Sequence, residues 1–160
     1  MAIIDIKSLS SHKAKFTTLL GIDLGEKTIG LALSDRNWMI ASPMETLKRD
    51  KFSKDWPKLE KIMQQNEVAG IVIGFPMNMN GTEGPRCQSV RQFAANILEK
   101  LDIPIVFWDE RLSTKAVTRT LLEADVSRKR QKELVDKLAA SYILQGALDS
   151  LKIHSQDGIE

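Results

Sequence analysis

The order in which apolar runs follow one another along the chain limits its fold more than any other feature. The segment "TIGLALSD" (28–35) places large apolar residues at every second position, and this period of two predicts a strand with unequal faces. Short apolar runs at 16–23 and 38–47 flank it and are also expected to be strands. The residues "LGEK" (24–27) suit a hairpin, in which we expect Gly25 to supply unusual backbone angles. This part of the chain is therefore predicted to form three hairpin-linked strands.

Helical and strand patterns alternate in the rest of the chain. Segments with apolar residues at helical spacing are separated by runs rich in Val and Ile, which are typical of strands buried on both faces. This order predicts an α/β fold with a mixed five-stranded sheet, in which three antiparallel strands are followed by parallel ones, and with helices on both faces. Functional sites in such sheets lie at the carboxyl ends of the parallel strands. The predicted helices are 53–66, a segment opening at Pro85, 113–124 and about 131–150, and the predicted strands are 68–76 and 103–110.

The composition excludes several kinds of site. The chain has 160 residues, enough for one domain, and contains a single cysteine, Cys87, and two histidines, His12 and His154. An intramolecular disulfide is impossible, and neither a thiol zinc centre nor a histidine-based site is expected. The sequence shows no membrane span and no secretory signal, so we expect a cytoplasmic protein with no membrane partner. We expect an N-terminal leader at 1–15, one domain at 16–152 and a C-terminal tail at 153–160.

Three acidic residues stand where the pattern predicts buried surroundings. Asp23 ends the apolar run "LLGID", and Glu110 follows the strand pattern "IPIVFWD". Asp136 shares a helical face with small and apolar residues, although an aspartate near a helix start is also stabilised by the helix dipole. A carboxylate at the border of a core costs desolvation energy unless it meets a cation or hydrogen-bond donors, and two that approach each other repel. A divalent cation shared by these acids would remove both penalties.

A site built from three carboxylates offers only oxygen ligands. Such a site suits Mg²⁺ or Mn²⁺ better than zinc. One or two of these ions, with water and phosphate oxygens in the remaining positions, form the arrangement of metal-dependent phosphodiesterases. The sequence therefore predicts hydrolysis of a phosphodiester bond, with Asp23, Glu110 and Asp136 as metal ligands and catalytic residues.

Four segments resemble, in the same order, the motifs of one protein family. They are "LLGIDLGEKTIGLALSD", "IVIGFPMNMNGTEGPR", "WDERLST" and "VDKLAASYILQGAL", and the similarity covers about residues 18–150. These motifs are similar to those of the YqgF family, which has the ribonuclease H-like fold and whose members are described as pre-16S rRNA nucleases and as Holliday junction resolvases. Two positions depart from the family pattern. Glu26 stands where a small or hydroxyl residue is common, and Asn80 stands in place of a loop acid.

The resemblance implies a site and a function. By position, Asp23, Glu110 and Asp136 match the acidic triad of the family. The implied function is a metal-dependent nuclease of ribosome biogenesis that processes the 5′ end of pre-16S rRNA, with ribosomal particles as partners. Branched DNA is the alternative substrate. Junction cleavage needs paired active sites, so a stable symmetric homodimer would favour branched DNA. The sequence leaves both a monomer and a homodimer open.

Residues around the acids are candidates for contacting nucleic acid. The missing side chain of Gly25 lets a phosphate approach the backbone, and a helix N-terminus after the loop 76–84 attracts anions. The basic runs "KRDK" (48–51) and "SRKRQK" (127–132) add positive charge. Turn geometry and solvated loops explain the same residues without a ligand. The predicted nucleic-acid contacts are Gly25, Lys27, Thr28, Asn78, Asn80, Gly81, Arg86, Arg111, Arg128, Lys129 and Arg130.

Two rival functions belong to other classes. The segment "GIDLG" (21–25) also resembles the phosphate loop of ATP-binding domains related to actin and sugar kinases, but those proteins clamp the nucleotide between two such domains. A second phosphate loop and an adenosine loop would have to follow this segment, and 160 residues leave no room for them. The other rival is a nucleic-acid-binding ribosome-assembly factor with weak or no nuclease activity, because acids and loops alone do not establish turnover.

Overall fold

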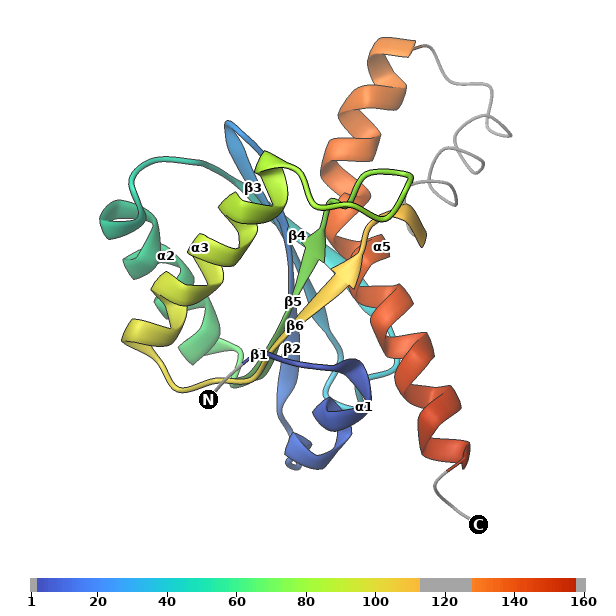
Figure 1. Cartoon of the computed structure of the whole chain (residues 1–160). Coiled ribbons are helices and arrows are strands. Elements are labelled where there is room, and N and C mark those ends of the chain that lie inside the picture. The colour runs from blue at the N-terminus through green and yellow to red at the C-terminus, as the bar shows by residue number, and fades with distance from the viewer. Residues whose placement is uncertain (1–2, 113–127, 158–160) are drawn as a thin grey trace.

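The computed structural model describes residues 3–112 and 128–157, and describes side chains for 3–112 and 138–153. Within these ranges the chain forms a six-stranded mixed sheet with helices on both faces (Figure 1). The strand order across the sheet is β1-β6-β5-β2-β3-β4. The strands are β1 (Ile3–Ile4), β2 (Thr18–Leu24), β3 (Thr28–Ser34), β4 (Ala41–Lys48), β5 (Val68–Phe75) and β6 (Ile105–Asp109). The helices are α1 (Ile6–Leu9), the short 3₁₀ helix η1 (Ser10–His12), α2 (Phe52–Gln65), α3 (Pro85–Lys100) and α5 (Arg128–Asp157).

The sheet has an antiparallel half and a parallel half, as predicted. β2 pairs antiparallel with β3, and β3 pairs antiparallel with β4, whose Pro43 lies on the edge strand of the sheet. β5 lies between β2 and β6 and is parallel to both. The carboxyl ends of β2, β5 and β6 therefore lie at the same edge, which brings Asp23 and Glu110 to one side of the molecule.

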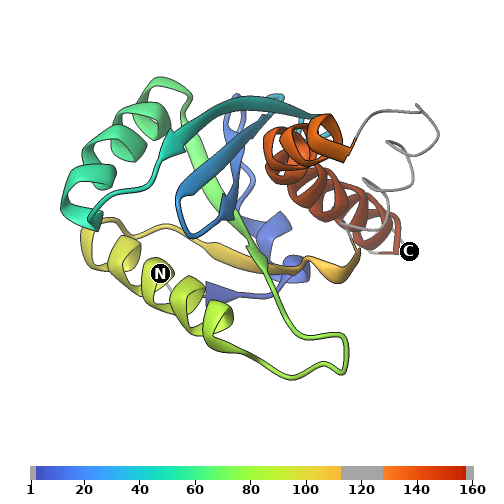
Figure 2. The same cartoon turned by 90° about the horizontal axis from the view of Figure 1, so that it is seen from above.

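Each face of the sheet carries its own hydrophobic core. Helices α2 and α3 cover one face, and α5 crosses the other (Figures 1 and 2). Ile29 and Leu31 are buried against α2 and α3, which confirms the alternation predicted for β3. On the other face, α5 packs directly against the backbone of Gly21 in β2. A Cβ on Gly21 would lie 2.8 Å from Cβ of Leu144 in α5. The close approach of α5 therefore depends on a missing side chain in β2.

The N-terminal segment corrects the predicted number of strands. Ile3 and Ile4 pair in parallel with Ile105 and Val106 of β6, so the sheet has six strands instead of five. Leu9 in the following helix is fully buried in the core beneath α5. The sequence-based boundary after residue 15 leaves these residues outside the domain, because the segment is mostly polar and only a few apolar side chains attach it.

The hairpin between β2 and β3 also differs from its prediction. Gly25 does not adopt a left-handed conformation, and among the described glycines only Gly81 has a positive φ, of 85°. The turn is closed by a 2.9 Å hydrogen bond from the Gly25 N–H to the carbonyl of Thr28. The glycine is needed for space, since a Cβ there would lie 3.2 Å from atoms of Thr28.

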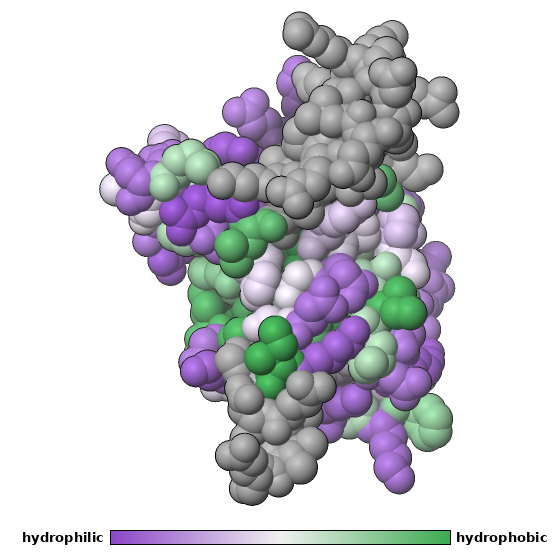
Figure 3. Space-filling view, turned by 90° about the vertical axis from the view of Figure 1, so that its right-hand side faces the viewer, coloured by the Kyte–Doolittle hydropathy of each residue, from purple (hydrophilic) through white to green (hydrophobic). Residues whose placement is uncertain are grey.

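Helix α5 is longer than the helix predicted at about 131–150, and the helix predicted at 113–124 lies outside the described residues. Seen from the side that α5 covers, the described surface is mostly hydrophilic, with small and separate hydrophobic areas (Figure 3). Within the described ranges, no helix combines the length and the apolar character that crossing a bilayer requires.

Candidate active site

The side chains of Asp23 and Glu110 meet at the carboxyl end of the sheet. Asp23 lies near the end of β2, and Glu110 directly follows β6, where its N–H donates to the carbonyl of Phe75 at 3.2 Å. β5 lies between them, and its Gly74 provides the space for the Glu110 side chain. A Cβ on Gly74 would overlap Oε1 of Glu110 and would lie 2.9 Å from its Cγ. Glu110 therefore reaches over Gly74 toward Asp23.

The acid pair is electrostatically unusual. Burial raises the pKa of Glu110 to about 7, and both the charge of Asp23 and a hydrogen bond with its side chain act in the same direction. The guanidinium of Arg86 opposes this shift in pKa by favouring the charged form of Glu110. A hydrogen bond between two carboxyls requires a proton on one of them. When this proton is lost, the two carboxylates repel each other unless a cation binds between them.

The donor set of this pair fits a hard divalent cation. Two carboxyls in contact offer several oxygen ligands, and a cation would take the place of the shared proton. Asp136, the predicted third ligand, belongs to α5, but its side chain lies outside the described part of the structure. Among the side chains that are described, no three Asp, Glu, His or Cys residues form a group that could hold a metal. The structure therefore brings together two of the three predicted acids.

A pocket of about 540 Å³ opens beside Glu110. Asn78, Arg86 and Arg111, three of the predicted nucleic-acid contacts, line it together with Glu110. α3 begins at one wall of this pocket, with Pro85 in its first turn and no side chain capping its N-terminus. The Arg86 guanidinium and a helix N-terminus therefore line one pocket beside Glu110, and this combination attracts anions.

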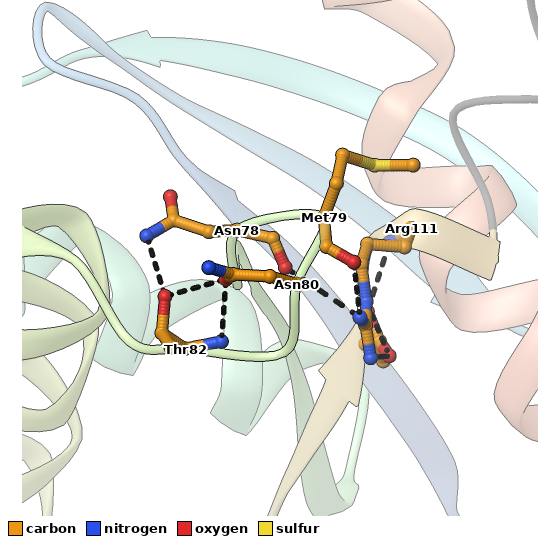
Figure 4. A network of polar contacts seen from close by, with 6 residues as sticks. Asn78, Met79, Asn80, Thr82 and Arg111 are labelled. Carbon is orange, nitrogen blue, oxygen red and sulfur yellow. Dashed lines mark hydrogen bonds and ion pairs between the residues drawn. The ribbon is translucent and has the colours of Figure 1, made fainter.

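The loop between β5 and α3, which forms a wall of this pocket, is held by its own side chains (Figure 4). Nδ2 of Asn78 donates to Oγ1 of Thr82 at 3.0 Å. Oδ1 of Asn80 accepts from the N–H of Thr82 at 3.1 Å and from its hydroxyl at 2.7 Å. Asn78 and Asn80 thus organise the loop, and Gly81 supplies its left-handed turn.

Arg111 ties this loop to the end of β6. Its Nη1 donates to the carbonyl of Met79 at 3.3 Å, and its Nη2 donates to Oδ2 of Asp109 at 2.7 Å (Figure 4). The hydrogen bonds from Arg111 hold the pKa of Asp109 below its usual value. Of the two roles predicted for Arg111, phosphate binding and orientation of a carboxylate, the geometry supports orientation, but the oriented carboxylate is Asp109.

Among the described side chains, the other predicted contacts do not line the pocket beside Glu110. Lys27 and Thr28 are exposed at the tip of the β2–β3 hairpin, and Gly25 lines a second, smaller pocket. Arg128, Lys129 and Arg130 lie in α5, and their side chains are outside the described part of the structure.

Two residues near the site were missed in the sequence. Gly74 makes room for Glu110, and the only sequence signal for it is a glycine inside the buried run "VAGIVIGFP". Arg49 reaches the β2–β3 turn, where its Nη1 donates to the Gly25 carbonyl at 2.7 Å. Its place in the basic run "KRDK" suggested only a solvated loop or a general positive patch.

Comparisons with known proteins agree on one family. A family model described as "RuvX: Holliday junction resolvase" matches residues 17–150. A protein of Paramagnetospirillum magneticum named "Putative pre-16S rRNA nuclease" is 56% identical over 150 residues, which cover 94% of this chain and 97% of that protein. A protein of Phenylobacterium zucineum with the same name is 53% identical over 154 residues, covering 95% and 99%. The solved structure of Thermus thermophilus RuvC matches with a TM-score of 0.51 at 11% identity over 86% of this chain and 98% of that one, a likeness of fold alone.

Proposed function

We propose a nuclease function from the premise that this chain belongs to the RuvX family of Holliday junction resolvases. The resemblance to the YqgF family is thereby confirmed, and the likeness to RuvC supports the ribonuclease H-like fold. The proposed reaction is metal-dependent hydrolysis of a phosphodiester bond in nucleic acid. The observation that carries the proposal is the contact between Asp23 and Glu110, together with the pocket that Glu110 and Arg86 line.

The acids are proposed to hold one or two Mg²⁺ or Mn²⁺ ions. Asp23 and Glu110 are the first two ligands, and Asp136 is the proposed third. Asp136 lies two helical turns before Ile143 in α5, and Ile143 contacts the same space above Gly74 that Glu110 fills. When bound, such an ion stabilises charge on phosphoryl oxygens and lowers the pKa of water.

Other groups of the chain position the substrate. Arg86, at the start of α3, attracts a phosphate and favours the ionised form of Glu110. Asn78 and Arg111 form part of the pocket wall and contact each other. They therefore give the nucleic-acid strand a fixed surface to lie against. Gly74 leaves the space in which Glu110 approaches Asp23.

The favoured substrate is the 5′ end of pre-16S rRNA, in the cytoplasm and on ribosomal particles. The names of relatives at 53% and 56% identity support this choice. Branched DNA is the second candidate, because the matching family is described by junction resolution. A single copy of the chain suffices for cutting one RNA strand, whereas symmetric cutting of a junction needs two copies.

The test is cleavage of a precursor 16S rRNA fragment and of a four-way DNA junction, in Mg²⁺, Mn²⁺ or EDTA. We expect Asp23→Asn, Glu110→Gln and Asp136→Asn each to reduce cleavage on the order of a thousandfold while circular dichroism shows a folded protein. Glu99→Gln, which removes an exposed acid of α3, is the matched control and should cut normally. Cleavage that persists in EDTA or in all three variants rejects the mechanism. Binding without cleavage of either substrate leaves the assembly-factor alternative.

A further inference from the structure

A second pocket, of about 220 Å³, shares the Arg86 side chain with the pocket that Glu110 lines. The turn after β2, the residue Arg49 after β4 and the first turns of α3 form its walls. Pro85 and Arg86 line both pockets, so the two pockets are neighbours at the start of α3. Gly25, in the wall of the second pocket, lies two residues after Asp23, a distance of about 7 Å along an extended strand.

The arginines of this pocket differ from the others in the described part of the chain. Arg36, Arg91 and Arg111 each form an ion pair with a carboxylate. Arg49 and Arg86 have no carboxylate oxygen within 4.0 Å among the described residues. The two guanidinium groups not paired in this way are therefore the two that line the second pocket.

Neutral acceptors hold Arg49 in place. Its Nη1 donates to the Gly25 carbonyl at 2.7 Å, and its Nη2 donates to the Ser89 hydroxyl at 3.3 Å. These contacts fix the direction of the guanidinium while leaving its charge and further N–H donors available. A fixed guanidinium with spare donors has the geometry that binds a phosphate.

We propose that this pocket binds a backbone phosphate of the nucleic-acid strand, next to the phosphate that is cut, with Arg49 as its anchor. The proposal rests on the proposed function, since it places one strand across both pockets. Glu26 also lines the pocket, and its exposed carboxylate opposes the binding of an anion. Removal of the Glu26 charge should therefore have the opposite effect to removal of the Arg49 charge.

The test measures binding of the full chain to a labelled single-stranded RNA and to a labelled four-way DNA junction, in EDTA and at several salt concentrations. Arg49→Gln keeps an amide donor for the Gly25 carbonyl but removes the charge. We expect it to weaken binding about five- to tenfold and to reduce the slope of log Kd against log salt by about 0.7 to 0.9.

Three further variants test whether the charge is responsible. Arg49→Lys should retain the salt slope, and Glu26→Gln should tighten binding about two- to threefold. Lys58→Gln, an exposed charge on α2, is the control and should change neither quantity.

A purely structural role for Arg49 predicts a different outcome. In that case Arg49→Gln would keep the wild-type salt slope. This result overturns the proposal, as does an equal loss of binding in Lys58→Gln or a wild-type chain that binds neither probe. If Arg49→Gln does not fold, the affinity of Glu26→Gln decides.

The two proposals fail separately. A wild-type chain that cuts neither substrate, yet loses affinity and salt slope in Arg49→Gln, removes the nuclease proposal and keeps the phosphate pocket. Normal cleavage with an unchanged salt slope in Arg49→Gln does the reverse. The probe that loses more affinity in Arg49→Gln identifies the strand, RNA or DNA, whose phosphate occupies the pocket.

Discussion

The two ends of the central sheet treat their polar groups in opposite ways. At the amino end of β2, the Ser34 hydroxyl accepts from the Leu19 N–H at 2.8 Å, and Nε1 of Trp38 donates to the Thr17 carbonyl at 3.1 Å. The acceptors of these two hydrogen bonds are neutral, and the carboxylates at this end, Asp35 and Glu67, meet N–H groups or an arginine. At the carboxyl end, Asp23 and Glu110 meet each other, and burial adds to their mutual repulsion. At the amino end, each of these polar groups has a hydrogen-bond partner. At the carboxyl end, the two acids are stabilised only when a proton or a cation lies between them.

Backbone strain is found at the opposite end from the acid pair. Phe16, Trp38 and Glu67 have positive φ values of 65°, 57° and 51°, and they are the only described residues other than glycine that do. Phe16 and Glu67 precede β2 and β5, and Trp38 lies between β3 and β4, so all three are at the amino end. Strained backbone can indicate a functional site, but in this structure it occurs at tight turns. The candidate site is distinguished instead by the repulsion between two buried carboxyls.

The same substitution at the two ends of β5 gives the largest expected contrast. Gly74→Ala places a Cβ 2.6 Å from Cδ1 of Ile143 and against Glu110, so it should lower cleavage on the order of a hundredfold. Gly70→Ala meets the flexible ends of Leu19 and Leu9 at 3.0 and 3.1 Å. It should lower the free energy of unfolding by about 1–3 kcal/mol and leave the cleavage rate of the folded enzyme unchanged. Equal cleavage rates in the two variants would show that Gly74 does not position Glu110.

Two carboxyls, one at each end, should respond to pH with opposite signs. The pKa of Glu110 is raised to about 7, so its contribution to stability is complete below about pH 4.5 and is lost as the pH rises through 7. In EDTA at about pH 8, Glu110→Gln should therefore increase the free energy of unfolding, by no more than about 3 kcal/mol. Near pH 4 the difference should vanish.

Asp35 supplies the opposite case. Burial opposes its ionisation, but hydrogen bonds from the N–H groups of Ile40 and Met39 hold its pKa below 3.8. Its contribution is present above that value and is lost as the pH falls through the pKa of the folded protein. Asp35→Asn should lower the free energy of unfolding by roughly 1 kcal/mol at neutral pH. Urea denaturation at several pH values measures both variants, and changes of the same sign would contradict the comparison.

Two arginines that join separate segments give the smallest contrast. Arg111 joins the loop after β5 to Asp109, and Arg36 joins the turn at Phe16 to Glu67. Replacement of either by Ala should lower the free energy of unfolding by about 1 kcal/mol or less. Only Arg111→Ala should also slow cleavage, by about five- to tenfold, because the pocket wall loses its anchor. Single-turnover cleavage separates the two, and a similar slowing in Arg36→Ala would show that the two ends are coupled.

Sequence reasoning located the acid pair because strand periodicity shows where a strand ends. Asp23 and Glu110 each close an apolar run, and parallel pairing then places them at one edge. The role of Gly74 was hidden because a glycine in a strand does not reveal which side chain fills its space. β1 was hidden because its two residues pair with β6, distant in sequence, and show no periodicity.

Arg49 shows a second limit of sequence reasoning. A run of basic residues has the same pattern whether its side chains face water or a pocket, and only the fold brings Arg49 to the Gly25 carbonyl and to Ser89. Local pattern thus predicts elements and their ends. Local pattern does not predict which long side chains reach over a neighbouring strand, because tertiary packing determines this.

The position of α5 after every strand has a consequence for biosynthesis. During translation, the face of the sheet that carries Gly21 and Gly74 stays bare until Leu144 and Ile143 leave the ribosome, because these α5 residues cover it. A nascent chain would therefore complete the surroundings of Glu110 only after the α5 residues that cover this face have been made.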